Sequence, residues 1–520
     1  MDTHQKSKVY HSLVHWHNFR LKVFLEGIVI GIIAGIITVL FRYSIEQGEQ
    51  LRSLVYAQIE NNLLLLLPWL GALLVIALLL GLIIRFEPMT GGSGIPQVKG
   101  VLLGLLKTNW KSVLAGKFLG GVLAIGAGLS LGREGPSIQL GAAVGQGLSR
   151  MIGRTKMEER FLMTSGASAG LAAAFNAPLA GVVFALEELH KNFSPAVLMS
   201  AMAASITSAL VTQLFFGDSP VFTITDLPVF PFRYYGDLII LGVLVGFLGI
   251  AFNKMLIKTL NLYNRQNRIP RIALAAIPLL IGGIAGTVLP EILGGGNNLV
   301  GPIVSGNYGL SMLLILLAAK FAFTMISYGS GVPGGIFLPM LVIGALAGGA
   351  FSNVAVHFLA VDPHYTTNFV ILAMAALFTA VVKAPITGSI LITEMTGSFS
   401  HLISLITISM TAYIVAELAK SAPVYEELLD RILVKTKALL HSDKSRTIVD
   451  FVVCVGSKLD GKRVKNVEWP SQCLLISIKR GDKEIVPQGD TQILAGDFVY
   501  LLTSTANAEH VRQLAQECLV

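Results

Sequence analysis

The sequence predicts an all-α polytopic membrane protein with a duplicated transmembrane part, followed by a small α+β domain. Three observations predict this fold class. Of 520 residues, 53% are hydrophobic and 13% are charged, with a mean hydropathy of +0.69, whereas soluble domains carry about 25% charge. Glycine and proline patterns in the first half of the apolar region recur in the second half. After about residue 435 the apolar runs stop and an alternating polar pattern begins.

Apolar runs of about 20 residues are long enough to cross a bilayer, and we expect ten or more spans. They include 23–41, 63–84, 161–186, 192–217, 237–253, 272–290, 310–328, 337–361 and 396–415. The polar segment 1–22 has no small-residue cleavage site, so we expect a cytosolic N-terminal segment and no cleaved signal peptide. The transport domain is then 23–435, followed by a linker at 436–445 and a soluble domain at 446–520.

The formal net charge of +8 does not indicate nucleic-acid binding, because the positive residues cluster in loops between spans. Such clusters are typical of loops on the cytosolic side of a membrane. They comprise Arg150, Arg154, Lys156 and Arg160; Arg265, Arg268 and Arg271; and Arg431, Lys435 and Lys437. The three cysteines, Cys454, Cys473 and Cys518, all lie in the tail, and their odd number favours free thiols over a disulfide framework.

Two patterns recur in the same order and predict repeat halves at about 25–217 and 235–418. The first recurs 203 positions later and the second 207 positions later. They are Gly132-x3-Pro136-x4-Gly141-Ala142-x2-Gly145 with Gly335-x3-Pro339-x4-Gly344-Ala345-x2-Gly348, and Ala177-Pro178-x2-Gly181 followed by Glu187 with Ala384-Pro385-x2-Gly388 followed by Glu394. Repeated transporters commonly build the substrate site between such halves, from discontinuous helices.

Three short segments read as helices that begin inside the membrane; we call them the helix-start segments. Each has glycines that allow the backbone to bend, then a proline suited to a first helical turn. They are 92–96 with Gly92, Gly94 and Pro96, 132–136 with Gly132, Gly135 and Pro136, and 335–339 with Gly335 and Pro339. A helix N-terminus offers unpaired N–H groups and about half a positive charge, so convergent starts predict an anion site. Glycine and proline that only kink or pack helices are the alternative.

In order and spacing, these segments resemble the signature segments of the CLC chloride channels and chloride/proton antiporters. The resemblance extends over 25–430 and includes Ala174-Phe-Asn-Ala-Pro-Leu-Ala-Gly181, Glu187-Glu188, Glu394 and Tyr425. It implies a homodimer with a pore in each subunit, built from two inverted halves in the cell (plasma or inner) membrane. It also implies voltage-dependent-type anion transport, with chloride and protons as the transported ions and no cofactor, metal or enzymatic activity.

The resemblance assigns roles to six residues. The hydroxyls of Ser93 and Tyr425 and the backbone amides of Ile336 and Phe337 would hold chloride. Glu134 falls at the gating glutamate and Glu188 at the inner proton glutamate. A carboxylate at a helix start mimics the anion, and burying it unprotonated costs on the order of 20 kcal/mol by idealised estimates. Its charge state must therefore be tied to its position.

Several alternatives stay open at this point. Glu134 could pair with Arg133, although adjacent residues rarely face each other at a helix start. Glu188 could be a solvated charge at a helix end beside His190 and Lys191. Glu187 and Glu394 are expected to stabilise helix ends or the inner pore. The family often has acidic residues after Gly-Ser-Gly-Ile-Pro, whereas Gln97 and Lys99 stand here, which leaves the neighbouring ion pairs open.

We expect a proton-coupled chloride antiporter, and the alternative is a passive chloride channel of the same fold. A glutamate at 188 favours the antiporter. A metal-dependent intramembrane hydrolase would need a clustered ligand set such as His-Glu-x-x-His, which the spans lack. A cation transporter would need carbonyl- and carboxylate-lined sites instead of amide-rich helix starts.

The tail, 446–520, resembles a TrkA-C domain, a regulatory module of several transporters. We expect strands at 447–454, 473–480, 483–486 and 498–503, helices at 459–467 and 506–519, and turns at 481–482, 489–490 and 496–497. The segment that carries the resemblance runs from Gln488 to Leu502. Such a module binds an unidentified cytosolic ligand or reinforces dimerisation, or it is a passive folding and assembly appendage.

Overall fold

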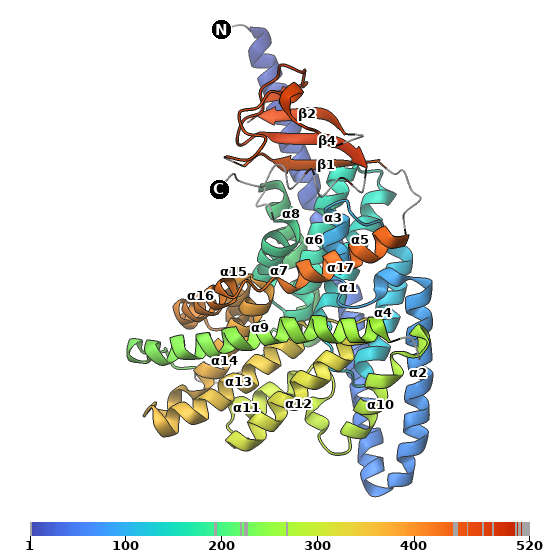
Figure 1. Cartoon of the computed structure of the whole chain (residues 1–520), viewed down its shortest axis with the longest axis vertical. Coiled ribbons are helices and arrows are strands. Elements are labelled where there is room, and N and C mark those ends of the chain that lie inside the picture. The colour runs from blue at the N-terminus through green and yellow to red at the C-terminus, as the bar shows by residue number, and fades with distance from the viewer. Residues whose placement is uncertain are drawn as a thin grey trace. The chain divides into compact units, whose positions relative to one another are not determined.

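The computed structural model describes residues 3–191, 195–218, 221–222, 227–266, 269–439, 446–454, 456–470, 473–480, 483–504, 507 and 511. It divides into two compact units. The first comprises 1–99 and 108–427, and the second comprises 100–107 and 428–520. In Figure 1 the chain runs from blue through green and yellow to red.

The membrane unit contains two runs of eight α-helices, which correspond in order. The first run is α1 Thr3–Asn61, α2 Leu66–Phe86, α3 Ile95–Leu102, α4 Trp110–Gly126, α5 Glu134–Met151, α6 Lys156–Phe175, α7 Pro178–Phe184 and α8 Pro195–Phe216. The second is α9 Tyr235–Arg265, α10 Ala276–Ala285, α11 Asn297–Val304, α12 Leu310–Gly329, α13 Phe337–Phe358, α14 Thr366–Val382, α15 Pro385–Thr396 and α16 Leu402–Leu418. The helix α17, Val424–Leu439, follows them. Figure 1 shows the two runs as adjacent groups of helices.

Corresponding helices pack in corresponding ways. The helix α6 packs against α5 and α8, as α14 packs against α13 and α16. Small residues permit this close approach: a Cβ on Gly141 would collide with the backbone of Gly166, and a Cβ on Gly344 would meet the carbonyl oxygen of Ala373 at 2.8 Å. The recurrence of glycines at these two positions therefore reflects equivalent helix pairs in two repeats.

Two expectations about the membrane helices need correction. Eight helices in the described residues are long and apolar enough to span a membrane, fewer than the ten or more expected, because several helices are short or carry polar residues. The run 161–186 is not one span: it breaks between α6 and α7, where Asn176 is left-handed with φ 52° and Pro178 starts the next helix. At the N-terminus, α1 is continuous from Thr3 to Asn61, so the helix that contains the first span already begins within the segment 1–22.

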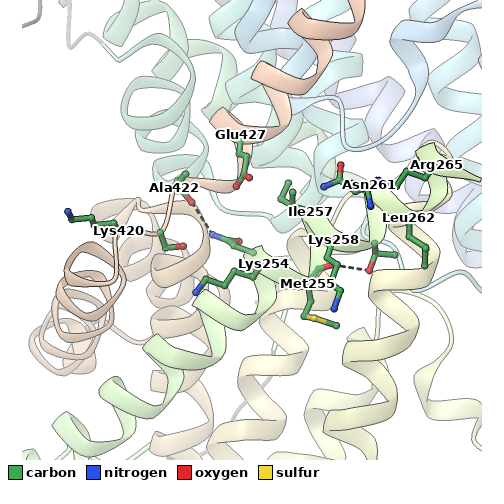
Figure 2. A pocket seen from close by; sticks show the side chains of 13 residues that line it. Lys254, Met255, Ile257, Lys258, Asn261, Leu262, Arg265, Lys420, Ala422 and Glu427 are labelled. Atoms are coloured by element: carbon green, nitrogen blue, oxygen red, sulfur yellow. Dashed lines mark hydrogen bonds between the residues drawn. The ribbon is translucent and has the colours of Figure 1, made fainter.

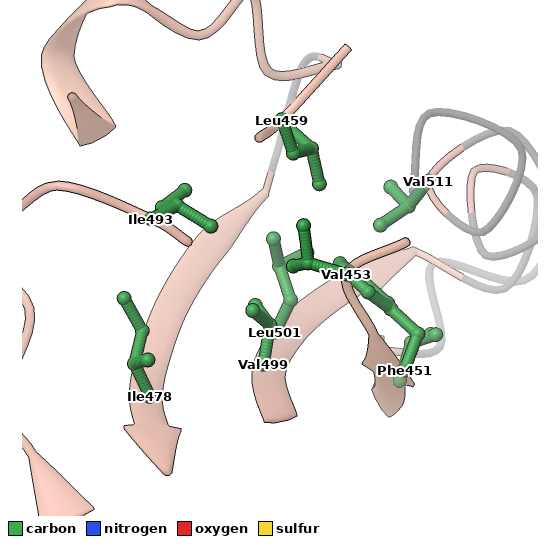
Figure 3. Close-up of a cluster of buried hydrophobic side chains, with 9 residues drawn as sticks. Phe451, Val453, Leu459, Ile478, Ile493, Val499, Leu501 and Val511 are labelled. Carbon is green, nitrogen blue, oxygen red and sulfur yellow. The ribbon is translucent and has the colours of Figure 1, made fainter. Parts of the chain in front are cut away.

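The C-terminal unit holds a four-stranded antiparallel sheet in the order β1-β4-β2-β3. The strands are β1 Arg446–Val452, β2 Leu474–Arg480, β3 Lys483–Ile485 and β4 Phe498–Ser504. One face buries a cluster drawn in Figure 3, which comprises Val449, Phe451, Val453, Leu459, Ile478, Ile493, Val499, Leu501 and Val511. The four expected strands are thus confirmed.

The short helical segment expected near 459–467 is confirmed only in part. Turns and a single 3₁₀ turn at Val464–Asn466 stand there, because backbone bonds tie this segment to another loop: Gly461 and Val464 donate to the carbonyls of Ile493 and Thr491 at 2.9 Å. The expected turn at 481–482 and nearly all of the helix at 506–519 lie outside the described residues.

Candidate functional site

The three helix-start segments meet and are bonded to one another through their backbones. Gly132 and Gly335 exchange two N–H···O hydrogen bonds of 2.7 and 2.8 Å, and form an isolated β-bridge between the two halves. The N–H of Gly92 lies 3.1 Å from the carbonyls of Gly331 and Val332, and Gly334 donates back to Gly92 at 3.0 Å. Segments some 200 residues apart therefore hold one set of helix N-termini in one place.

Each helix starts slightly earlier than its proline. The helices α3, α5 and α13 begin at Ile95, Glu134 and Phe337, so Pro96, Pro136 and Pro339 are their second or third residues. Prolines in a first turn remove N–H groups that have no intrahelical partner anyway. The amides of Ile336 and Phe337 remain as donors at the start of α13.

Ser93 and Tyr425 are buried to 1% and 0% exposure. Neither hydroxyl has a hydrogen-bond partner among the residues that the structure describes. Buried hydroxyls are normally satisfied, so these two hydroxyls are the candidates for binding a ligand at this site. Tyr425 lies in the neighbourhood of Glu134, Glu188 and Tyr328, which places both predicted glutamates in the same region.

Glu134 is the first residue of α5 and is fully buried. Both carboxylate oxygens lack a hydrogen-bond partner within the described part of the chain. The backbone N–H groups of Glu134 itself and of Leu338, at the start of α13, lie near this carboxylate without meeting hydrogen-bond geometry. A Cβ on Gly132 would collide with this carboxylate, so a larger residue there would require the acid to shift.

Arg133 does not pair with Glu134. Its Nη1 lies 3.4 Å from Oε1 of Glu46, as expected for neighbours that diverge at a helix start. Arg133 also lines a cavity of about 450 Å³ together with Leu131, Gly295 and Leu338. Leu338, whose backbone N–H lies close to Glu134, also lines this cavity, but Glu134 itself is not among the lining residues.

Glu188 lies in a π-helical turn, Ala185–His190, and is 4% exposed. It is therefore not a solvated helix-end charge. Lys99 Nζ lies 2.8 Å from its Oε1 and 3.3 Å from Oε1 of Glu426, and Lys191 also pairs with Glu426. The lysine that departs from the family pattern is thus the direct partner of the predicted proton glutamate. π-Helical turns are frequent at functional sites.

Glu187 and Glu394 cap helices of the opposite halves. Glu187 accepts from the N–H and hydroxyl of Thr387 at 2.8 and 2.6 Å, at the start of α15. Glu394 accepts from the N–H groups of Leu179 and Ala180 at 3.0 and 2.7 Å, at the start of α7. This confirms that both residues stabilise helix ends.

Sequence reasoning missed two lysines. Lys117 and Lys320 are both fully buried. Lys117 Nζ donates to the carbonyls of Thr90 and Gly92 at 2.8 and 2.6 Å, and Lys320 Nζ donates to Ile292 and Gly294 at 2.8 and 2.7 Å. Each lysine holds the turn before a short helix, α3 or α11. Their separation of 203 positions, equal to one repeat offset, is the signal that would have revealed them.

Comparison with known proteins agrees with this geometry. A family model described as voltage gated chloride channel matches residues 72–417, and a TrkA-C domain model matches 448–516. The H(+)/Cl(-) exchange transporter ClcA of Vibrio cholerae serotype O1 is 38% identical over 440 residues, covering 81% of this chain and 92% of the relative. ClcA of Yersinia pseudotuberculosis is 33% identical over 442 residues, covering 83% and 92%.

Among solved structures, a slow cyanobacterial Cl-/H+ antiporter aligns with a TM-score of 0.76 and 32% identity, over 80% of this chain and 99% of the other. A CLC-type fluoride/proton antiporter shares the fold, with a TM-score of 0.64 and 21% identity, over 76% and 96%. By family model, relatives and fold, this chain belongs to the voltage-gated chloride channel (CLC) family and carries a TrkA-C domain at its C-terminal end.

Proposed function

We propose that this protein is a proton-coupled chloride antiporter of the cell membrane, and that it works as a homodimer with a cytosolic C-terminal domain. The observation that carries the proposal is Glu134: a fully buried carboxylate without hydrogen-bond partners among the described residues, at a helix start whose backbone is bonded to the start of α13. Relatives that are 33–38% identical and are named H(+)/Cl(-) exchange transporters support it.

In this mechanism, chloride binds the orphan hydroxyls of Ser93 and Tyr425 and the N–H groups of Ile336 and Phe337. Helix N-termini attract anions without a fixed cation, so binding is reversible. Ionised Glu134 lies against the N–H groups of Glu134 and Leu338 at the starts of α5 and α13, where it takes the place of an anion and closes the path. Once protonated, it loses that attraction and swings away, carrying its proton.

The inner proton station is Glu188. Its ion pair with Lys99 lowers the energetic cost of an ionised carboxylate in a site with almost no solvent exposure. A proton that reaches Glu188 from the cytosol passes towards Glu134 while chloride moves in the opposite direction. Glu187 and Glu394 take no part, because their oxygens are bound to helix ends.

The test uses full-length protein in liposomes loaded with high chloride, under an outward chloride gradient. We expect the wild type to drive protons inward against their own gradient. Glu188→Gln and Glu134→Gln are expected to retain chloride flux and lose proton movement. The exposed Glu60 provides the control Glu60→Gln, which should exchange like the wild type.

Chloride flux without uphill proton movement in the wild type would contradict exchange and identify a passive channel of the same fold. The dimer is tested separately by light scattering of the protein in detergent, where a mass of one subunit would contradict it.

A further inference from the structure

The helix α9 is longer than the hydrocarbon core of a bilayer is thick. Its 31 residues are about 46 Å long, whereas the hydrocarbon core is about 30 Å thick and is crossed by about 20 residues. Tyr234 and Tyr235 stand at its N-terminal end, and tyrosines favour the membrane interface. Counting from Tyr235, the opposite interface falls near Lys254, so the following residues reach the headgroup layer.

Three cations lie on one face of this protruding end. Lys254, Lys258 and Arg265 follow at i, i+4 and i+11, within about 40° of one another around the helix. All three are exposed, and the structure gives them no hydrogen bond or ion pair with any other described residue. Loops on the cytosolic side carry positive charge generally, but here the charges converge on one helix face.

This face lines a pocket of about 750 Å³ between α9 and the link from α16 to α17 (Figure 2). Glu427 is the single carboxylate among its thirteen lining residues. Lys420 lines the far end, and its side chain extends away from the other cations in Figure 2. The pocket therefore offers positive charge from Lys254, Lys258 and Arg265, and space enough for a small anionic group.

The wall of the pocket also contains an unsatisfied acceptor. Asn253 is 3% exposed, and its Nδ2 donates to the carbonyls of Val381 and Ala422, both at 3.1 Å. These two bonds fix the orientation of the amide, and its Oδ1 is buried without a hydrogen-bond partner in the described residues. An anion without O–H groups, such as chloride, cannot satisfy it, because Oδ1 needs a donor such as a hydroxyl.

Cations together with an orphan acceptor match a phosphate ester that also carries free hydroxyl groups. The apolar side chains of Met255 and Leu262, 43% and 69% exposed, line the same pocket and suit an acyl chain. We propose that this pocket binds a hydroxylated phosphate ester, with its phosphate on Lys254, Lys258 and Arg265 and a hydroxyl on Asn253. The same chemistry is presented by a glycerol-type phospholipid headgroup and by soluble glycerol phosphate.

The experiment uses full-length protein in neutral detergent and two lipid probes, phosphatidylglycerol and phosphatidylmethanol. These lipids carry the same charge, and only the first has headgroup hydroxyls. Native mass spectrometry measures how much of each lipid is retained. Calorimetric titration with sn-glycerol 3-phosphate and with inorganic phosphate tests the soluble source.

The pocket variant is Lys254→Gln/Lys258→Gln/Arg265→Gln. Its matched control, Lys22→Gln/Lys111→Gln/Lys156→Gln, removes three exposed cations elsewhere in the membrane unit. Because all six side chains are exposed, both variants should fold, and their thermal unfolding is compared with that of the wild type. The pair Lys254→Gln/Lys258→Gln serves if the triple variant unfolds early.

We expect the wild type and the control variant to retain phosphatidylglycerol at least tenfold better than phosphatidylmethanol, and the pocket variant to lose this preference. Saturable binding of glycerol phosphate that disappears in the pocket variant, without such lipid retention, would support the same site with a soluble source. Equal retention of both lipids by the wild type would overturn the role of Asn253. If the pocket variant and the control variant bound every probe equally, the proposal that this pocket is a binding site would be wrong.

Discussion

At the scale of single residues, the ion pair between Lys99 and Glu188 determines whether a charged carboxylate can be accommodated at position 188. Both side chains are almost fully buried and 2.8 Å apart. A buried pair stabilises little by itself, but loss of one partner leaves an uncompensated charge that costs about 3–5 kcal/mol. Lys99 therefore permits an ionised acid at position 188.

Lys99→Gln is expected to lower thermal stability in detergent more than the double variant Lys99→Gln/Glu188→Gln, because the double variant leaves no unpaired carboxylate. The coupling energy from the four proteins should be about 1–3 kcal/mol, in the range found for contacting residues. Unfolding midpoints measured for the four proteins test this. Additive losses would mean that the pair has no energetic coupling.

The sequence was most informative where a residue's neighbours in the chain determine its environment. Glu134 could be located because glycine and proline beside it predict a helix start. The partner of Glu188 could not, because Lys99 is 89 positions away and the family pattern gave no guidance. The orphan state of the Ser93 hydroxyl was also unpredictable, since it depends on what packs around the side chain.

At the scale of helices, the two repeats stabilise each other by exchanging caps. Glu187 of the first half binds the start of α15, and Glu394 of the second half binds the start of α7. Carboxylates are favourable at helix N-termini because they satisfy orphan N–H groups and the helix dipole. The sequence predicted their structural role but not the exchange between halves, because register between distant helices is set by packing.

Glu187→Gln and Glu394→Gln should each reduce the free energy of unfolding by about 1.5–3 kcal/mol, the value of a hydrogen bond to a charged group. Neither should change the number of protons moved per chloride. Glu417→Gln is the control: Glu417 is 57% exposed and pairs with Lys383, and exposed pairs contribute about 0–1 kcal/mol. A change in proton coupling in either cap variant would contradict a purely structural role.

The two buried lysines allow a matched comparison of equivalent turns. Lys117→Met and Lys320→Met should both lower stability, because each leaves buried carbonyls unpaired at about 1–3 kcal/mol per group. Only Lys117→Met should also weaken chloride binding, since Lys117 holds the turn that carries Ser93. Calorimetric titration with chloride tests this difference, and equal affinities in the two variants would argue against it.

At the scale of the whole molecule, the chain combines a membrane unit with a C-terminal unit that has its own core. The four strands of this unit were predictable from alternating apolar residues. The short helical segment expected near 459–467 is reduced to one 3₁₀ turn because backbone bonds to the 491–493 loop hold the rest in turns. Sequence periodicity carries no information on such long-range bonds.

Asp497 gives the C-terminal unit a pH-dependent contribution to stability. Burial alone would raise the pKa of this carboxyl, but hydrogen bonds from Arg480 at 2.8 Å and from the N–H of Leu494 at 2.9 Å, with the guanidinium charge, lower the pKa below its usual value. A lowered pKa contributes stability above the unfolded pKa of about 3.9, and this stability is lost as pH falls through the folded pKa.

We therefore expect Asp497→Asn to weaken hydrogen-exchange protection of β2 and β4 at pH 7, and this difference from the wild type to shrink below about pH 4, the unfolded pKa of aspartate. Asp490→Asn removes a 74% exposed partner of Arg463 and Lys465 and should change little. A constant difference between pH 7 and pH 3 would contradict an electrostatic origin.

The bridge between Gly132 and Gly335 limits the ways in which transport can occur. Each of its two bonds is worth about 1 kcal/mol net, and a buried N–H or C=O left unpaired costs about 1–3 kcal/mol more. A cycle that rocked one repeat against the other would break this bridge and the exchanged caps at every turnover. The fold therefore favours the form of the proposed cycle in which the backbone stays in place and only the Glu134 side chain rotates.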